Sequence, residues 1–154
     1  MLFSVLEEVI AESKSFDLVL VGTGPGSYNA LRSSIAAAWG IAKARHIPVS
    51  GISSVFGYDA PEYFVVGDAR SNQCFFGYVS EGRLTSPLEL LSPETASTRL
   101  IEGVPIYSTG ASLLGAEILH PSATTLARHA AQAGPTEPIY LKPPHITPSR
   151  PKTT

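Results

Sequence analysis

The sequence has little charge, and this scarcity limits what the protein can hold by itself. Charged residues make up 16% of the 154 residues, and the net charge is −2. Globular proteins usually contain about 25% charged residues. A protein that grips nucleic acid alone normally carries a basic face. We therefore expect any RNA to be contacted only through a partner.

The chain also lacks the features of secreted and membrane proteins. Cys74 is the single cysteine, so no internal disulfide can form, which fits a reducing compartment. No apolar run approaches the roughly 20 residues that cross a bilayer. The first ten residues carry Glu7 and Glu8 instead of the basic start of a signal peptide. We expect a cytoplasmic protein that does not contact the membrane.

Patterns of common catalytic and metal centres are missing as well. The four histidines stand singly, with no zinc-binding spacing, and no Gly-x-Ser-x-Gly elbow occurs. Cys74 lies next to Phe75 and Phe76 in an expected strand, which favours a buried, inert thiol over a nucleophile. Asp68 could bind metal or phosphate, but a carboxylate that caps backbone N–H groups of a hairpin turn is favoured. The sequence therefore predicts no catalytic residue and no metal site.

Hydrophobic periodicity predicts an α/β fold. An amphipathic helix over 2–13 is followed by an apolar strand over 18–21, a helix over 27–45 and a strand over 47–52. The last three form a β-α-β unit, whose strands should be parallel. The other expected elements are a helix or loop over 53–62, hairpin strands over 63–68 and 73–80, a strand over 84–91, a helix over 93–101 capped by Ser92, a strand over 104–108, and helices over 112–119 and 123–133.

We expect these elements to form two lobes and a tail. The partial N-terminal lobe spans 1–58, and the second α/β lobe spans 59–142. The tail over 143–154 is rich in proline and has no apolar period, so we expect it to be disordered or draped over the surface.

The glycine-rich run 22–27 lies between an expected strand and an expected helix, which is where phosphates bind in many α/β proteins. A P-loop would need Lys and Ser or Thr after the last glycine, and a dinucleotide site would need an acidic residue about 20 positions later. Neither is present. The favoured interpretation is a tight turn with Ser27 as helix N-cap. Direct ligand contact stays open, and its candidate residues are Gly24, Gly26, Ser27 and Arg32.

The helices expected over 2–13 and 27–45 carry more apolar and small residues than are needed to cover one thin sheet. Residues 33–38 are mostly small, so another helix could approach closely, and Trp39 beside them could anchor a partner. The alternative is that both helices pack only on their own sheet. The candidate partner-interface residues are Leu2, Leu6, Ile10, Leu31, Ile35, Ala38 and Trp39.

The run 21–32, Val-Gly-Thr-Gly-Pro-Gly-Ser-Tyr-Asn-Ala-Leu-Arg, resembles the glycine-rich signature of the TsaB (YeaZ) family, which serves tRNA threonylcarbamoyladenosine biosynthesis. Further blocks that resemble the family follow in the same order at 36–42, 47–54, 67–70 and 138–142. The resemblance is strong up to about residue 79 and thinner beyond it.

This resemblance implies an actin-like, Hsp70-like ATPase fold built from ribonuclease-H-type units. Family members begin with a β-hairpin that carries an Asp-Thr-Ser motif, so the resemblance implies an N-terminally truncated relative with an incomplete first lobe. Without that hairpin, residues 18–21 should expose an unpaired, apolar sheet edge.

The resemblance also implies a function. The chain would be a non-catalytic scaffold that binds a TsaD-like catalytic subunit and works with a TsaE-like ATPase, and a homodimer is also possible. ATP and magnesium would reach the complex through these partners, with no cofactor bound by this chain alone. The alternatives are an ATPase or glycoprotease-like hydrolase that uses the Gly22–Ser27 loop, and an inactive truncated paralogue.

Overall fold

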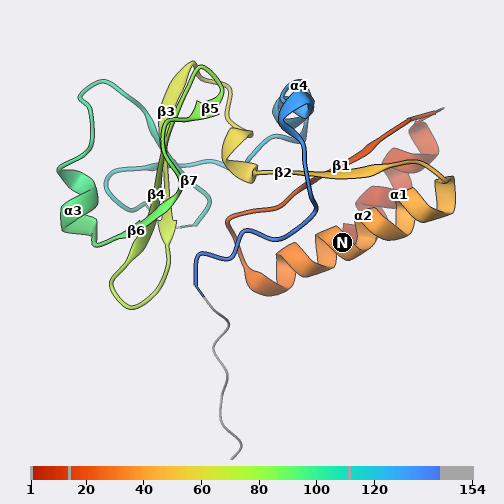
Figure 1. Cartoon of the computed structure of the whole chain (residues 1–154), viewed down its shortest axis with the longest axis horizontal. Coiled ribbons are helices and arrows are strands. Elements are labelled where there is room, and N and C mark those ends of the chain that lie inside the picture. The colour runs from red at the N-terminus through yellow and green to blue at the C-terminus, as the bar shows by residue number, and fades with distance from the viewer. Residues whose placement is uncertain (1, 14, 111, 143–154) are drawn as a thin grey trace, which may run out of the picture. The chain divides into compact units, whose positions relative to one another are not determined.

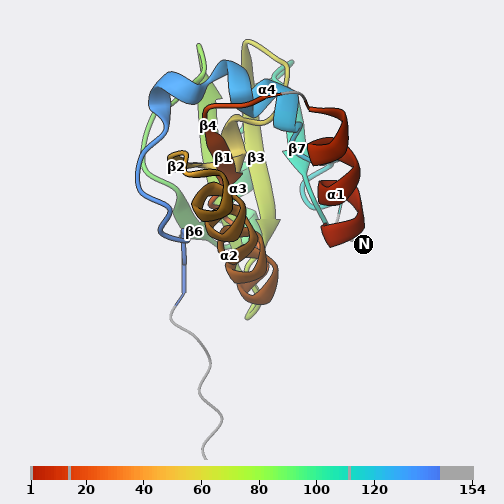
Figure 2. The ribbon, with the colours of Figure 1, turned by 90° about the vertical axis from the view of Figure 1, so that its right-hand side faces the viewer.

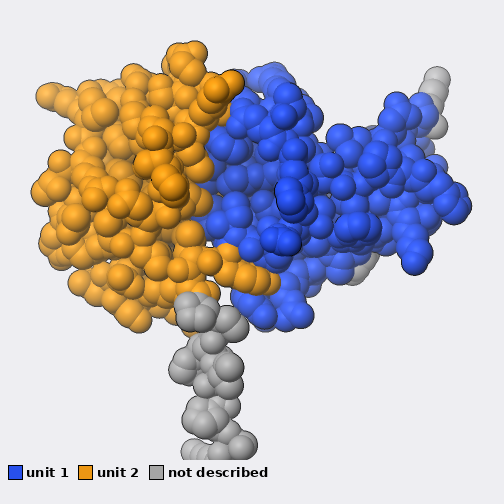
Figure 3. All heavy atoms as spheres, in the orientation of Figure 1, with its two compact units in different colours: residues 1–59, 120–139 blue, residues 60–119, 140–154 orange. Residues whose placement is uncertain are grey.

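The computed structural model describes residues 2–13, 15–110 and 112–142, and the chain divides into two compact units (Figures 1 and 3). Unit 1 consists of Met1–Asp59 and His120–Ile139, and unit 2 of Ala60–Leu119 and Tyr140–Thr154. The Pro-rich tail expected over 143–154 lies outside the described residues.

Unit 1 starts with the expected helix and β-α-β unit. Its elements are α1 (Leu2–Glu12), β1 (Val19–Gly22), α2 (Tyr28–Arg45) and β2 (Val49–Ile52). The two strands pair in parallel, with Val19 opposite Val49, which confirms the predicted arrangement. The helix α2 lies along both strands (Figures 1 and 2). It thereby buries the side of the sheet that two strands alone would leave in water.

A distant segment completes unit 1. It contains α4 (Ala123–Arg128) and the short 3₁₀ helix η2 (Ala130–Gln132), and α4 packs on a second 3₁₀ helix, η1 (Ser54–Phe56). The single helix expected over 123–133 is therefore present as two pieces that meet at His129. Beside β2, Gly51 and Gly134 exchange two backbone N–H···O hydrogen bonds of 2.8 Å each. These bonds cover one edge of the sheet.

The other edge of this small sheet belongs to β1. Within the described residues, β1 pairs only with β2. The side chain of Leu18, directly before the strand, is 39% exposed. The sheet edge at 18–21 is thus unpaired in this part of the chain, as the sequence analysis expects.

Unit 2 contains β3 (Glu62–Asp68), β4 (Cys74–Ser80), β5 (Arg83–Leu84), β6 (Glu89–Leu91), α3 (Pro93–Ser97), β7 (Ile106–Ser108) and β8 (Glu117–Ile118). Its strands form a mixed sheet with the order β5-β4-β3-β7-β8, in which β6 also pairs with β4. The β3–β4 hairpin is antiparallel, and β7 runs parallel to β3. The core contains the buried residues Phe64, Val66, Cys74, Phe76, Ala96 and Ala116.

Three predicted elements of unit 2 differ from the structure. The strand expected over 84–91 is divided into β5 and β6, with Pro87 between them, because proline cannot donate a ladder hydrogen bond. The helix expected over 93–101 ends at Ser97. The helix expected over 112–119 is wrong. Leu114 and Gly115 adopt positive φ angles, which break a helix, and the strand β8 follows them in parallel pairing with β7.

Candidate interaction surface and glycine-rich loop

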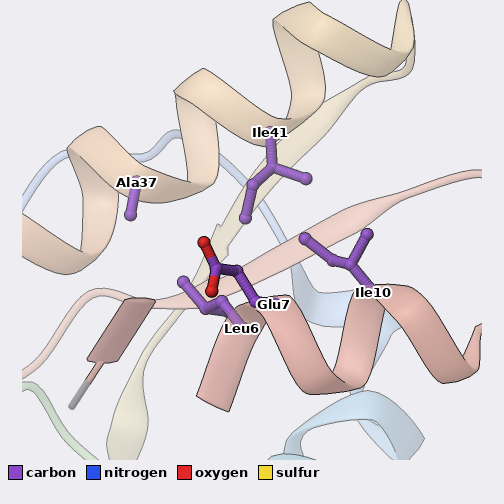
Figure 4. A pocket seen from close by; sticks show the side chains of 5 residues that line it. All are labelled: Leu6, Glu7, Ile10, Ala37 and Ile41. Atoms are coloured by element: carbon purple, nitrogen blue, oxygen red, sulfur yellow. The ribbon is translucent and has the colours of Figure 1, made fainter. Parts of the chain in front are cut away.

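The helices α1 and α2 enclose a groove. Figure 4 shows Leu6, Glu7 and Ile10 of α1 directed toward Ala37 and Ile41 of α2. The groove has a volume of about 190 Å³ and a mostly apolar lining. Sites for small molecules usually measure about 300–1,000 Å³. The groove is therefore better suited to an inserted side chain than to a nucleotide.

The apolar residues of α1 divide into an inner and an outer half. Leu6 and Ile10 are half-buried at the groove, whereas Val5 is 57% and Val9 53% exposed. Leu2 belongs to α1, but its side chain lies outside the described part of the structure. The outer half therefore forms a strip of solvent-exposed apolar surface along α1.

The structure divides the candidate interface residues of α2 into two groups. Leu31 and Ala38 are only 8% and 5% exposed and belong to the core of unit 1, so they are not part of an accessible interface. The helical pattern that identified them marks the face that packs on β1 and β2. Ile35 is half-buried. Trp39 is 53% exposed, and its indole Nε1 donates a 3.0 Å hydrogen bond to Oγ1 of Thr136.

A line of small residues that the sequence analysis missed follows the accessible side of α2. Its members alternate at spacings of three and four residues, which places them on one helix face. Ala37 is half-buried and the others are exposed, and a Cβ atom added at Gly40 would meet nothing within 4 Å. The spacing places these residues on one face, but only the structure shows that this face is turned away from the sheet. Its members are Ala30, Ser33, Ala37, Gly40 and Ala44.

We call the accessible residues of α1 and α2 the two-helix surface. It combines bulky apolar side chains on α1 with the line of small residues on α2, and Trp39 is exposed on a different side of α2, because residues one or two positions apart do not share a helix face. Its members are Val5, Leu6, Val9 and Ile10 of α1, and Ala30, Ser33, Ala37, Trp39, Gly40 and Ala44 of α2.

The glycine-rich loop is tied to the segment that follows β2. Gly24 has a φ of 102°, a conformation that favours glycine. Its N–H donates to Oγ of Ser54 (3.2 Å), and its carbonyl accepts from Oγ of Ser53 (3.0 Å) and from the backbone N–H of Ser54 (2.8 Å). Polar groups of Gly24 are thus engaged within unit 1, and the loop has a structural role.

The other ligand candidates, Gly26, Ser27 and Arg32, lie at the start of α2. Gly26 and Ser27 are exposed. Ser27 occupies the N-cap position of α2, as predicted, but its side chain makes no capping hydrogen bond. Arg32 is directed to Tyr28 instead. Its Nη1 donates to the Tyr28 hydroxyl (3.0 Å), and its guanidinium lies 5.1 Å from the centre of that ring.

The family can now be identified. Residues 1–81 match the family model described as TsaD, tRNA N6-adenosine threonylcarbamoyltransferase, and this match covers 81 of 154 residues, more than half of the chain. The chain belongs to this family. The matched part contains α1, α2, the glycine-rich loop and the β3–β4 hairpin.

Relatives and solved structures agree with this membership. An uncharacterised protein of Mycobacterium tuberculosis is 27% identical over 94% of this chain and 73% of its own length. The tRNA threonylcarbamoyladenosine biosynthesis protein TsaB of Haemophilus influenzae is 26% identical over 90% of this chain and 77% of its own. YeaZ from Pseudomonas aeruginosa has a TM-score of 0.70 at 20% identity and covers 90% of this chain and 83% of the YeaZ chain. The chain is TsaB-like, and the actin-like α/β fold is confirmed.

The TsaB-like Asp-Ala-Arg block lies at the turn of the β3–β4 hairpin. The backbone N–H of Arg70 donates to Oδ1 of Asp68 (2.8 Å), which confirms that this carboxylate caps the turn. Arg70, Ser71 and Asn72 all have positive φ angles, between 53° and 61°. The ammonium of Lys142, which ends the last TsaB-like block, donates to the carbonyl oxygens of Ala69 (2.7 Å) and Arg70 (3.0 Å). Asp68 is therefore engaged within its own turn.

Cys74 is completely buried, as predicted for a thiol within this hairpin. Burial raises the pKa of the thiol, because an apolar surrounding disfavours the thiolate. Among the described residues, no group of three or more His, Cys, Asp or Glu side chains could hold a metal ion. No helix in the described ranges has both the length and the hydropathy that a membrane span requires.

Proposed function

We propose that this chain is a non-catalytic scaffold of the machinery that makes N6-threonylcarbamoyladenosine in tRNA, and that it binds a TsaD-like catalytic subunit through the two-helix surface. The similarity to the TsaB relative supports a role in the biosynthesis of this modified nucleoside. The observation that carries the interaction is the exposure of Val5 and Val9 on α1 and of Trp39 on α2. Aromatic side chains in such surroundings are common anchors of protein interfaces.

The proposal assigns cofactors and RNA to the partners. The low charge of the chain, with a net value of −2, supports a role in which tRNA is bound by the complex. ATP and magnesium would enter through a TsaE-like ATPase, while this chain binds no cofactor alone. The hydrogen bonds that Ser53 and Ser54 make with Gly24 support a structural role for the loop rather than phosphate binding.

A binding measurement with the TsaD-like protein of the same organism tests the interface. Trp39→Ala removes the exposed ring and one hydrogen bond, and we expect the Kd to rise by about 30-fold or more, since truncating an interface anchor costs about 2 kcal/mol or more. Ile101→Ala is the matched control, because Ile101 is 51% exposed but lies in unit 2. Its Kd should stay within about twofold of the wild-type value.

Titration calorimetry gives this Kd, and circular dichroism verifies that both variants are folded. An unchanged affinity of the Trp39→Ala variant would contradict the interface. A wild-type chain that binds no TsaD-like protein would contradict the function. Unaided turnover of ATP or of a peptide would contradict the non-catalytic role.

A second candidate function uses the glycine-rich loop. Gly26 and Ser27 are exposed at the start of an 18-residue helix, and helix N-termini favour anions. This reading predicts saturable heat when ATP and Mg²⁺ are titrated into the isolated chain, and no heat would remove it. Rescue of a bacterial strain that lacks TsaB would argue against an inactive paralogue.

A further inference from the structure

One flank of α2 combines aromatic and basic side chains. Tyr28, Arg32, Trp39 and Lys43 are all exposed. At about 100° per residue, these four positions of α2 lie within about 60° of one another around the helix axis. We call them the aromatic–basic face. Ala37, which lines the groove beside α1, lies on a different side of α2, so the aromatic–basic face is separate from the groove.

Both rings of this face are held in place and are still accessible. Trp39 is 53% exposed, and its indole Nε1 donates a 3.0 Å hydrogen bond to Oγ1 of Thr136. Tyr28 is 39% exposed, and the guanidinium of Arg32 lies 5.1 Å from the centre of its ring. A ring or guanidinium that is already oriented loses little conformational freedom when a flat group stacks on it. The face therefore offers two prepared stacking positions.

The charge of this face is positive, although the whole chain has a net charge of −2. The segments β1, α2 and β2 contain no aspartate or glutamate. Arg32 and Lys43 alternate along α2 with the two rings. Glu137, which follows Thr136 in the chain, opposes their attraction for anions. We therefore expect a polyanion to bind this face with an affinity that depends strongly on salt.

We propose that the aromatic–basic face binds unpaired RNA nucleotides, with bases stacked on Trp39 and on the Tyr28–Arg32 pair and with backbone phosphates beside Lys43. Alternating rings and cations hold single strands without reading their sequence. At about 1.5 Å per residue, the face from Tyr28 to Lys43 is about 22 Å long, which matches about six nucleotides stacked at about 3.4 Å each. This inference goes beyond the proposed function and rests on it only for the choice of RNA.

Fluorescence anisotropy of a labelled uridine octanucleotide tests this face on the isolated chain. We expect saturable binding at low salt. Trp39→Ala should raise the Kd about tenfold, the effect of losing one stacked base, and Trp39→Phe should recover most of the affinity because it retains a ring. Lys43→Ala should raise the Kd about fivefold and lower the slope of log Kd against log salt by about 0.7, because one phosphate contact is lost.

Arg45→Ala is the matched control for the loss of charge. It removes one positive charge from the same helix, but Arg45 lies over the ring of Phe16, at 5.5 Å from its centre, and not on the aromatic–basic face. The Kd of this variant should stay within about twofold of the wild-type value. Circular dichroism verifies that each variant is folded.

Three results would overturn the proposal. Equal effects of Lys43→Ala and Arg45→Ala would show only an influence of net charge. An unchanged Kd of the Trp39→Ala variant would exclude stacking on the indole. A wild-type chain that binds phosphatidylglycerol vesicles but not the octanucleotide would assign the face to an anionic membrane instead.

The proposed function is tested separately with the TsaD-like protein of the same organism. Lys43→Ala should leave the affinity for that protein within about twofold of the wild-type value, because Lys43 does not belong to the two-helix surface. A wild-type chain that binds the octanucleotide but not the TsaD-like protein would refute the proposed function and support the aromatic–basic face. The opposite result would refute the face and leave the proposed function standing.

Discussion

The bridge between Gly51 and Gly134 offers the sharpest test of how unit 1 is held together. An alanine at position 51 would place its Cβ against the carbonyl oxygen of Pro135 and 2.6 Å from Cγ2 of Thr23. The first of these neighbours is backbone and cannot rotate away. Gly51→Ala must therefore move β2 and the segment at 134–135 apart, or distort both.

The cost can be worked from these contacts. Overpacking in a closely packed site costs about 1–3 kcal/mol. Separation of the strands would also weaken the two Gly51–Gly134 hydrogen bonds, each of which contributes about 1 kcal/mol. We expect the free energy of unfolding to fall by about 2–4 kcal/mol, a large part of the roughly 5–15 kcal/mol of a typical domain.

Urea denaturation followed by tryptophan fluorescence measures this loss. Trp39 is the only tryptophan and lies in unit 1, so its signal reports on the affected unit. Gly40→Ala is the matched control, because its added Cβ meets no atom within 4 Å and lies inside α2. It should stabilise the chain by about 0.5–1 kcal/mol. A Gly51→Ala variant as stable as the wild type would refute the reasoning that this close approach supports the sheet.

Two further changes probe the packing of each unit. Burial raises the pKa of Tyr58 from 10.0 to about 12. The neutral phenol therefore stabilises unit 1 fully below pH 10. This stabilisation, up to about 3 kcal/mol of unfolding free energy, is lost as the pH rises toward 12. Tyr58→Phe should flatten the loss of stability between these pH values, and urea titrations at a series of pH values would show it; equal slopes would contradict the assignment. In unit 2, Ser92→Ala removes the side-chain cap that accepts from the N–H of Thr95 and should cost about 1 kcal/mol in thermal unfolding, whereas Ser86→Ala, on an exposed loop, should cost little.

Most of the fold could be predicted from local sequence patterns. The β-α-β unit was predictable because a short apolar strand, a breaking glycine run and a helical period follow one another between residues 18 and 52. The cap at Ser92 was predictable for the same reason, since its signal lies within four residues. The stretch over 112–119 was not, because its conformation depends on pairing with β7 and on positive φ angles at Leu114 and Gly115.

The candidate site was less predictable than the fold. A helical period marks an apolar face but does not say whether the sheet or a partner covers it. Leu31 and Ala38 are therefore core residues, although their pattern equally fitted an interface. The exposed neighbours, such as Gly40 and Val9, became visible only when the direction of the sheet relative to each helix was known. The turn at Asp68 was predictable because its hydrogen bond is local.

The discontinuity of unit 1 has a consequence for biosynthesis. Residues 60–119 of unit 2 form one continuous stretch, whereas β2 receives its Gly134 neighbour only after 82 intervening residues have been added. During synthesis on the ribosome, the β1–α2–β2 segment emerges early. The edge of β2 stays unpaired until residues 120–139 have also been made. The nascent chain is therefore open to wrong strand pairing or to chaperone binding during this interval, and its maturation is completed from the carboxyl-terminal side.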